Sequence, residues 1–139
     1  MMTIEAVRER LAISPFNGLL GVEPLAIAPQ LVLRLPANPI FEGRRGSNIL
    51  HGGVVGALID VACAMAVVVK TGGIAATIDL SIDYLAPATV EPLTATVEIL
   101  RNGKTLATTL TRITNEQGQA IAIGRAALKH MGPWTGAVA

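Results

Sequence analysis

Residues 51–70, HGGVVGALIDVACAMAVVVK, decide the fold of this chain because they form one long apolar stretch around a single carboxylate, Asp60. The apolar run at 54–69 is 16 residues long, which is shorter than the roughly 20 residues that span a bilayer. A charge near the centre of a membrane helix is also expensive. We therefore predict a buried helix of a soluble protein over about 51–70, ended by Gly72-Gly73.

Strand patterns follow this helix. Residues 76–87, ATIDLSIDYLAP, alternate strongly, so that Ile78, Leu80 and Ile82 share one face of a strand and the polar residues between them share the other. Further strands are predicted at 93–101, 104–114 and 120–130, with Asn102-Gly103 as a hairpin turn and 115–119 as another turn. Before the long helix we predict a short helix at 3–13, a break at 14–18, strands at 19–27 and 31–35, and a loop at 36–50.

These elements predict an α+β fold. A helix with apolar residues on every side has to be enclosed, and the simplest enclosure is a curved antiparallel sheet of about six strands. We expect one domain over 1–139, with its core at about 15–131 and a loose tail at 132–139.

Composition excludes several classes of protein. The formal net charge is +1 without a long run of one sign, which argues against a protein that binds the nucleic-acid backbone. Cys63 is the only cysteine, so there is no internal disulfide and a reducing, cytoplasmic location is expected. The N-terminus lacks the apolar region of a signal peptide. His51 and His130 have no cysteine cluster near them, so no metal site is expected.

The long helix carries two kinds of stripe. One is a core stripe at helical spacing, made of Val54, Leu58, Val61, Met65 and Val68. The other surrounds Asp60 with small residues, namely Gly56, Ala57, Cys63 and Ala64. Small residues allow a backbone or ligand to approach closely, and a buried carboxylate is costly unless something satisfies it. Asp60 either has a structural role, capping a loop or pairing with an arginine such as Arg44 or Arg45, or belongs to a functional site.

His51-Gly52-Gly53 lies at the predicted helix start. The first amides of a helix have no intrahelical partner and favour negative charge, so they could hold a developing oxyanion. The alternative is a tight loop-to-helix junction. Gly52 and Asp60 are eight residues apart, or about 12 Å along a helix axis, and cannot both touch one carbonyl group in the same chain. Two antiparallel copies could bring them together, which hints at an active site across a dimer interface.

The chain resembles the PaaI-like family of hotdog-fold acyl-CoA thioesterases over about 15–131. The similarity lies in His51-Gly52-Gly53, Asp60, TIDLSIDYLAPA at 77–88 and NGKTLA at 102–107. This resemblance implies a long helix wrapped by an antiparallel sheet, and dimers that join their sheets edge to edge and often pair into homotetramers. It implies hydrolysis of aryl- or fatty-acyl-CoA without a metal or other cofactor, coenzyme A being part of the substrate.

The resemblance also implies roles for individual residues. Asp60 falls on the catalytic acid, the Gly52 amide on the group that polarises the thioester carbonyl, and Thr77 on the residue that positions water. His51 falls on the motif histidine, which shapes the helix start. Several members carry Asn or Gln six residues before that histidine, where this chain has Arg45. Either Asn48 substitutes for that residue or the contact is absent.

Two further points stay open on the sequence alone. The phosphates of CoA need cations or amides, for which the candidates are Gly53, Arg45, Arg101 and Lys104, with Arg44 and Lys129 as further possibilities. Asp60 could act as general base on water or attack the thioester directly to give a mixed anhydride. The alternatives to a thioesterase are a non-catalytic protein that binds acyl-CoA or another apolar ligand, and a hydratase or dehydratase acting on acyl thioesters.

Overall fold

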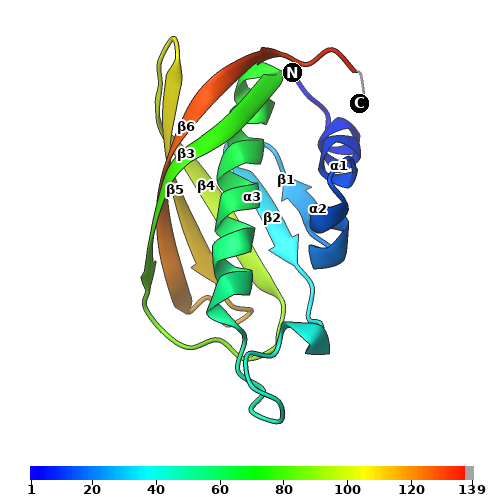
Figure 1. The fold of residues 1–139 in the computed structure, drawn as a ribbon, viewed down its shortest axis with the longest axis vertical. Coiled ribbons are helices and arrows are strands. Elements are labelled where there is room, and N and C mark those ends of the chain that lie inside the picture. Colours follow the sequence, from blue (N-terminus) through cyan, green and yellow to red (C-terminus); the bar gives the residue numbers. More distant parts are fainter. Residues whose placement is uncertain (137–139) are drawn as a thin grey trace.

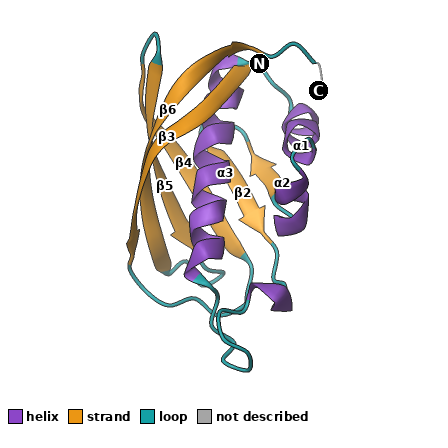
Figure 2. Cartoon of the chain, viewed as in Figure 1, coloured by secondary structure: helices purple, strands orange, loops and turns teal. Residues whose placement is uncertain are grey.

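Helix α3 (Gly52–Thr71) runs along the inside of a curved six-stranded sheet (Figures 1 and 2). This is seen in a computed structural model of the chain, which describes residues 1–136. The end of the predicted loose tail, 137–139, lies outside the described residues. The central helix and the six strands confirm the predicted α+β hotdog architecture.

The sheet is antiparallel throughout, with the strand order β1-β2-β4-β5-β6-β3. Its strands are β1 (Glu23–Ala26), β2 (Leu31–Leu35), β3 (Gly73–Tyr84), β4 (Leu93–Asn102), β5 (Leu106–Thr114) and β6 (Ala120–Pro133). Helices α1 (Ile4–Ala12) and α2 (Pro15–Leu20) and the short 3₁₀ helix η1 (Pro39–Phe41) complete the elements. In Figure 1, α1 and α2 lie together on the side of the molecule away from β3, so β3 is an uncovered edge.

Local hydrogen bonds set both ends of α3. His51 is the N-cap, and Gly72 adopts the left-handed conformation, with φ of 73°, while its amide donates to the carbonyl of Val68. The buried residues of α3 are Val55, Leu58, Ile59, Ala62, Cys63, Met65, Ala66, Val67 and Val68. The predicted core stripe is therefore only partly right, since Val54 and Val61 are half-buried. The sheet curves around a face of the helix that also contains Val55 and Ile59, which neither predicted stripe included.

Helix α2 replaces part of a predicted strand. Ser14 and Pro15 suggested a break before a strand at 19–27, but the Ser14 hydroxyl accepts a hydrogen bond from the Asn17 amide and Pro15 occupies the first turn. Both residue types favour a helix start as well as a break. Gly21, with φ of 71°, ends the helix, and β1 begins only at Glu23.

A β-bulge interrupts the predicted alternation of β3. The register against β6 shifts between Thr77 and Asp79, so Ile78 is 59% exposed instead of sharing a face with Leu80 and Ile82. The extra residue turns Thr77 toward α3, where its hydroxyl reaches the Cys63 thiol. Bulges commonly re-aim a side chain beside a functional site, and this one moves Thr77 from the expected outer face to the inner face.

The remaining strands form two hairpins, β4-β5 and β5-β6. The predicted Asn102-Gly103 turn is longer than two residues, because the Gly103 amide bonds the carbonyl of Leu106 and β5 starts there. Strand β6 continues to Pro133, beyond the predicted end at 130. Trp134 follows β6, and its ring lies under the guanidinium of Arg10. This cation–π contact packs α1 against the end of β6.

The packing of α3 is that of a core helix. Within residues 1–136 it is the one helix long and apolar enough to cross a membrane, but half of that stretch is buried inside the sheet. The helix packs tightly against Gly124 of β6, where an added Cβ would lie 2.3 Å from Ile59 Cγ2. The helix can lie this close to the sheet only because residue 124 has no side chain.

Candidate active site at the start of α3

The first turn of α3 leaves one amide without a partner. The Nδ1 atom of His51 accepts the Gly53 N–H at 2.8 Å, and the His51 carbonyl accepts the Val54 N–H at 3.0 Å. Within residues 1–136 the Gly52 N–H forms no hydrogen bond, and Gly52 is exposed. A free amide at the positive end of a 20-residue helix can stabilise negative charge on a ligand oxygen. The predicted role of Gly53 in substrate binding cannot use its amide, because His51 already occupies it.

Tyr84 braces this turn from β3. Its hydroxyl donates to the Gly52 carbonyl at 2.7 Å. A Cβ added at Gly52 would lie 3.4 Å from the Tyr84 ring, and one added at Gly56 would lie 3.5 Å from the Tyr84 hydroxyl. The ring therefore rests directly on the two glycines. Sequence alone does not single out Tyr84, because the contact joins residues 32 positions apart.

Asp60 is exposed, which corrects the expectation of a buried carboxylate. The ion pairs of the described residues are Arg34–Glu116 at 3.9 Å and Arg112–Glu98 at 3.4 Å, so neither Arg44 nor Arg45 neutralises Asp60. The apolar composition of the helix suggested enclosure on every side, but the sheet encloses only part of its circumference. Of the small residues around Asp60, Gly56, Ala57 and Ala64 are half-buried, whereas Cys63 is fully buried against the sheet.

Cys63 contacts both Asp60 and Thr77. The Cys63 thiol donates to the Asp60 carbonyl at 3.1 Å and is also within reach of the Thr77 hydroxyl. Burial, and secondarily the charge of Asp60, raises the pKa of the Cys63 thiol to about 12. The thiol therefore stays protonated at neutral pH and is a poor nucleophile. Cys63 thus lies between the Asp60 carbonyl and the Thr77 hydroxyl and is a packing residue.

The loop before α3 holds Asn48 and Arg45. The Glu42 carboxylate accepts the Gly46 amide at 3.0 Å and the Asn48 amide at 2.6 Å. Asn48 has φ of 56°, and its carbonyl accepts the Val90 amide at 3.1 Å. Its side chain makes no hydrogen bond to any described residue, so the amide group is free. Arg44 and Arg45 are exposed on the same loop, which projects beyond the start of α3 (Figure 1).

A family model described as the thioesterase superfamily matches residues 47–122, which include the helix start, Asp60 and Thr77. The chain belongs to the thioesterase superfamily. This confirms the predicted family and makes the protein a thioester hydrolase by class. Within residues 1–136 no group of three His, Cys, Asp or Glu side chains could hold a metal ion.

One curated protein and two solved structures show which members of the superfamily this thioesterase is similar to. It is 32% identical over 124 residues to the medium/long-chain acyl-CoA thioesterase YigI of Escherichia coli (strain K12), covering 78% of this chain and 80% of that protein. The solved zebrafish thioesterase superfamily member 2 is 31% identical with a TM-score of 0.82, covering 95% and 100% of the two chains. The E. coli PaaI protein from the phenylacetic acid degradation operon shares the fold, with a TM-score of 0.78 at 22% identity and coverage of 94% and 98%.

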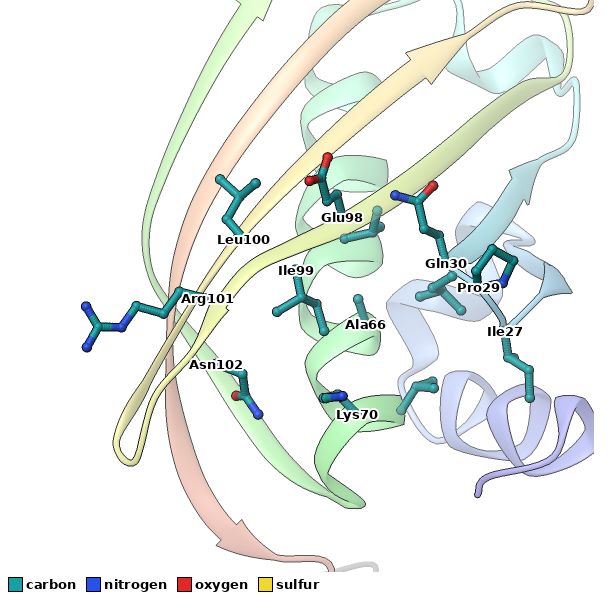
Figure 3. A pocket seen from close by; sticks show the side chains of 13 residues that line it. Ile27, Pro29, Gln30, Ala66, Lys70, Glu98, Ile99, Leu100, Arg101 and Asn102 are labelled. Atoms are coloured by element: carbon teal, nitrogen blue, oxygen red, sulfur yellow. The ribbon is translucent and has the colours of Figure 1, made fainter.

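The other predicted cations of the thioesterase lie far from its helix start. Arg101 and Lys104 flank the β4-β5 turn, at the opposite end of the molecule from the loop that carries Arg45 (Figure 1). A pocket of about 470 Å³ lies nearby, between the end of α3 and strand β4. Lys70 and Arg101 both line this pocket, and the Arg101 guanidinium extends away from α3 (Figure 3). One chain therefore does not bring Arg45, Arg101 and Lys104 together, and Lys129 is exposed on β6.

Proposed function

We propose that this thioesterase hydrolyses acyl-CoA to a free acid and CoA, in a site built by two copies of the chain. The observation that carries the proposal is the unpartnered Gly52 amide at the start of α3, on the same helix as an exposed, unpaired Asp60. An oxyanion donor and a carboxylate are the groups that thioester hydrolysis needs. The name of the E. coli relative, an acyl-CoA thioesterase, supports acyl-CoA as the substrate class.

A second copy supplies what one chain lacks. Gly52 and Asp60 lie about 12 Å apart along α3, so one thioester cannot touch both in a single chain. Strand β3 is a 12-residue edge strand with Ile74, Ile78 and Tyr84 exposed. Long uncovered edges with apolar side chains are avoided in isolated proteins, which favours pairing of β3 with β3 of a partner. Antiparallel pairing about a two-fold axis makes the two α3 helices antiparallel, so that Gly52 of each chain approaches Asp60 of the other.

The proposed reaction starts with the thioester oxygen at the Gly52 amide. Asp60 of the partner subunit removes a proton from water while the water oxygen attacks the carbonyl carbon, and Thr77 of the same subunit as Asp60 positions the water. The Gly52 amide holds the negative oxygen of the tetrahedral intermediate. Breaking of the C–S bond then releases the acid, and the CoA sulfur takes up the proton. In the other route, an Asp60 oxygen attacks the carbonyl carbon and the C–S bond breaks to release CoA as its thiolate. Water then hydrolyses the mixed anhydride to the free acid and the Asp60 carboxylate, and the proton that is released goes to the CoA sulfur.

We expect cationic side chains on the surface to bind the CoA phosphates. Arg45 lies on the loop beside Gly52, while Arg101 and Lys104 lie at the far end of the chain, so these cations would serve one CoA only if different subunits supply them. The homodimer or homotetramer that we expect offers such an arrangement. The free side-chain amide of Asn48 is available to orient the thioester or the water. A cytoplasmic location, expected from the single cysteine, belongs to the same proposal.

The test is release of free thiol from a panel of acyl-CoA substrates, from butanoyl to hexadecanoyl and including an aryl acetyl group. Wild type and Asp60→Ala are assayed side by side. We expect turnover of part of the panel by wild type and none by the variant. Absence of turnover with every substrate would overturn the proposal. Tight acyl-CoA binding without turnover would then favour the ligand-binding alternative, and hydration of crotonyl-CoA without thiol release would favour a hydratase.

A further inference from the structure

An apolar groove opens beside the proposed oxyanion amide. It has a volume of about 380 Å³ and lies between α2, η1 and the first two turns of α3. Its walls include Phe16, Leu19, Ile40, Val54 and Ala57. The volume falls in the usual range of small-molecule pockets, which runs from roughly 300 to 1,000 Å³. The sequence alone assigns no part in function to Phe16, Leu19, Ile40 or Val54, and it singles out Ala57 only as a small neighbour of Asp60.

Three of the wall residues are unusually exposed for their type. Phe16 is 51% exposed, Leu19 59% and Ile40 69%. Helix α2 is anchored to the core through Leu20, which is 3% exposed, and therefore presents Phe16 and Leu19 outward. Exposed apolar side chains gathered around a hollow usually mark a binding surface. The groove is thus suited to an apolar occupant.

The position of the groove identifies that occupant. His51 and Gly53, the two neighbours of Gly52 in the chain, both line it. Gly52 itself lines a smaller hollow of about 220 Å³ on the Tyr84 side of the helix start. A thioester whose oxygen lies on the Gly52 amide therefore has its carbonyl carbon between the two hollows, and the groove beside α2 is the larger of them. The charged residue of the lining is Glu42, which is negative and would repel the phosphates of CoA. The acyl end of the substrate fits these walls, and the nucleotide end does not.

We propose that Phe16 and Leu19 of α2, with Ile40 and Ala57, form the acyl-chain pocket and select long alkyl chains over short ones. The inference rests on the proposed acyl-CoA hydrolysis and adds the substrate class. Longer acyl chains bury more of their surface against these walls, at about 0.8 kcal/mol per buried methylene group. Small residues on the α3 side, Gly53 and Ala57, leave room for the chain.

The test compares kcat/KM for dodecanoyl-CoA with kcat/KM for butanoyl-CoA in the same enzyme preparation. This ratio does not depend on how much of a variant is folded. For Leu19→Ala and Phe16→Ala we expect the ratio to fall on the order of tenfold. Leu19→Trp, which narrows the groove, should also lower it.

Two leucine variants act as matched controls. Leu25→Ala changes an equally exposed leucine on β1, outside the groove. Leu85→Ala changes a leucine in the smaller hollow of about 220 Å³ on the Tyr84 side of the helix start. Both controls should keep the wild-type ratio. An unchanged ratio in Leu19→Ala, or a fall in Leu85→Ala instead, would overturn the assignment of the acyl pocket while the hydrolytic function stands.

A second measurement tests the alternative that the groove is filled by a side chain from another copy of the protein. Sedimentation equilibrium of wild type and Leu19→Ala measures the assembly. Loss of the dimer in Leu19→Ala with an unchanged chain-length ratio would overturn the proposal and make the groove a subunit contact. A retained dimer with a lowered ratio supports the acyl pocket. Failure of wild type to release thiol from either substrate would instead refute the proposed function, and the acyl pocket with it.

Discussion

Replacing Asp60 by Asn is expected to lower kcat by about a thousandfold or more while the chain stays folded. The amide keeps the size of the carboxylate but can neither take a proton from water nor attack a thioester. Asp60 is exposed and forms no ion pair among the described residues, so the free energy of unfolding should change by no more than about 0.5 kcal/mol. Thiol release measures the first quantity and denaturant unfolding the second.

Asp79→Asn is the matched control for this prediction. Asp79 is also an exposed aspartate, on strand β3, and its removal changes the net charge by the same amount. Its turnover should remain close to that of wild type. Substantial hydrolysis by Asp60→Asn, or an equal loss in an Asp79→Asn variant that sedimentation equilibrium shows to be dimeric, would show that the reacting carboxylate has been wrongly assigned.

Gly52→Pro is expected to lower kcat by about a hundredfold, because it removes the unpartnered N–H and nothing else of the first turn. Proline is well tolerated at the first position of a helix, where its fixed φ suits the backbone. His51 before it has φ of −64° and ψ of 130°, an extended conformation compatible with a following proline. Helix α3 should therefore form normally, as circular dichroism and thermal unfolding can check.

Gly52→Pro removes the N–H and also adds side-chain carbon atoms, and Gly52→Ala shows which of these two changes lowers turnover. Alanine keeps the N–H, and its Cβ would meet the Tyr84 ring at 3.4 Å, which is a close but tolerable contact. We expect Gly52→Ala to retain most of the turnover that Gly52→Pro loses. Equal losses in the two variants would mean that space beside Tyr84, not the amide, is what the reaction requires.

Residues close together in the sequence account for the parts of the fold that could be predicted. The ends of α3 follow from His51 and from Gly72, and both signals are local. Helix α2 was missed because Ser14 and Pro15 are found at breaks and at helix starts alike. The bulge at Ile78 could not be foreseen, since it arises from the register between β3 and β6.

In the candidate site, too, some features follow from the local sequence and others depend on contacts between distant segments. The spacing of Gly52 and Asp60 is a property of the sequence, and it is enough to indicate a site shared by two chains. The hydrogen bond from Gly53 to His51, which leaves Gly52 as the free amide, depends on the orientation of the imidazole ring. The brace from Tyr84 and the groove beside α2 depend on contacts between distant segments. The exposure of Asp60 could not be predicted because composition does not tell which side of an apolar helix the sheet leaves open.

The claim that two chains share each site has a direct test in mixed dimers of Asp60→Asn and Gly52→Pro. The two variants are co-expressed with different affinity tags, and dimers that carry both tags are purified. Each mixed dimer then holds one site with both lesions and one site with neither, so thiol release should recover to about half of the wild-type rate. Mixed dimers no more active than the two variants alone would contradict a site built from Gly52 of one chain and Asp60 of the other.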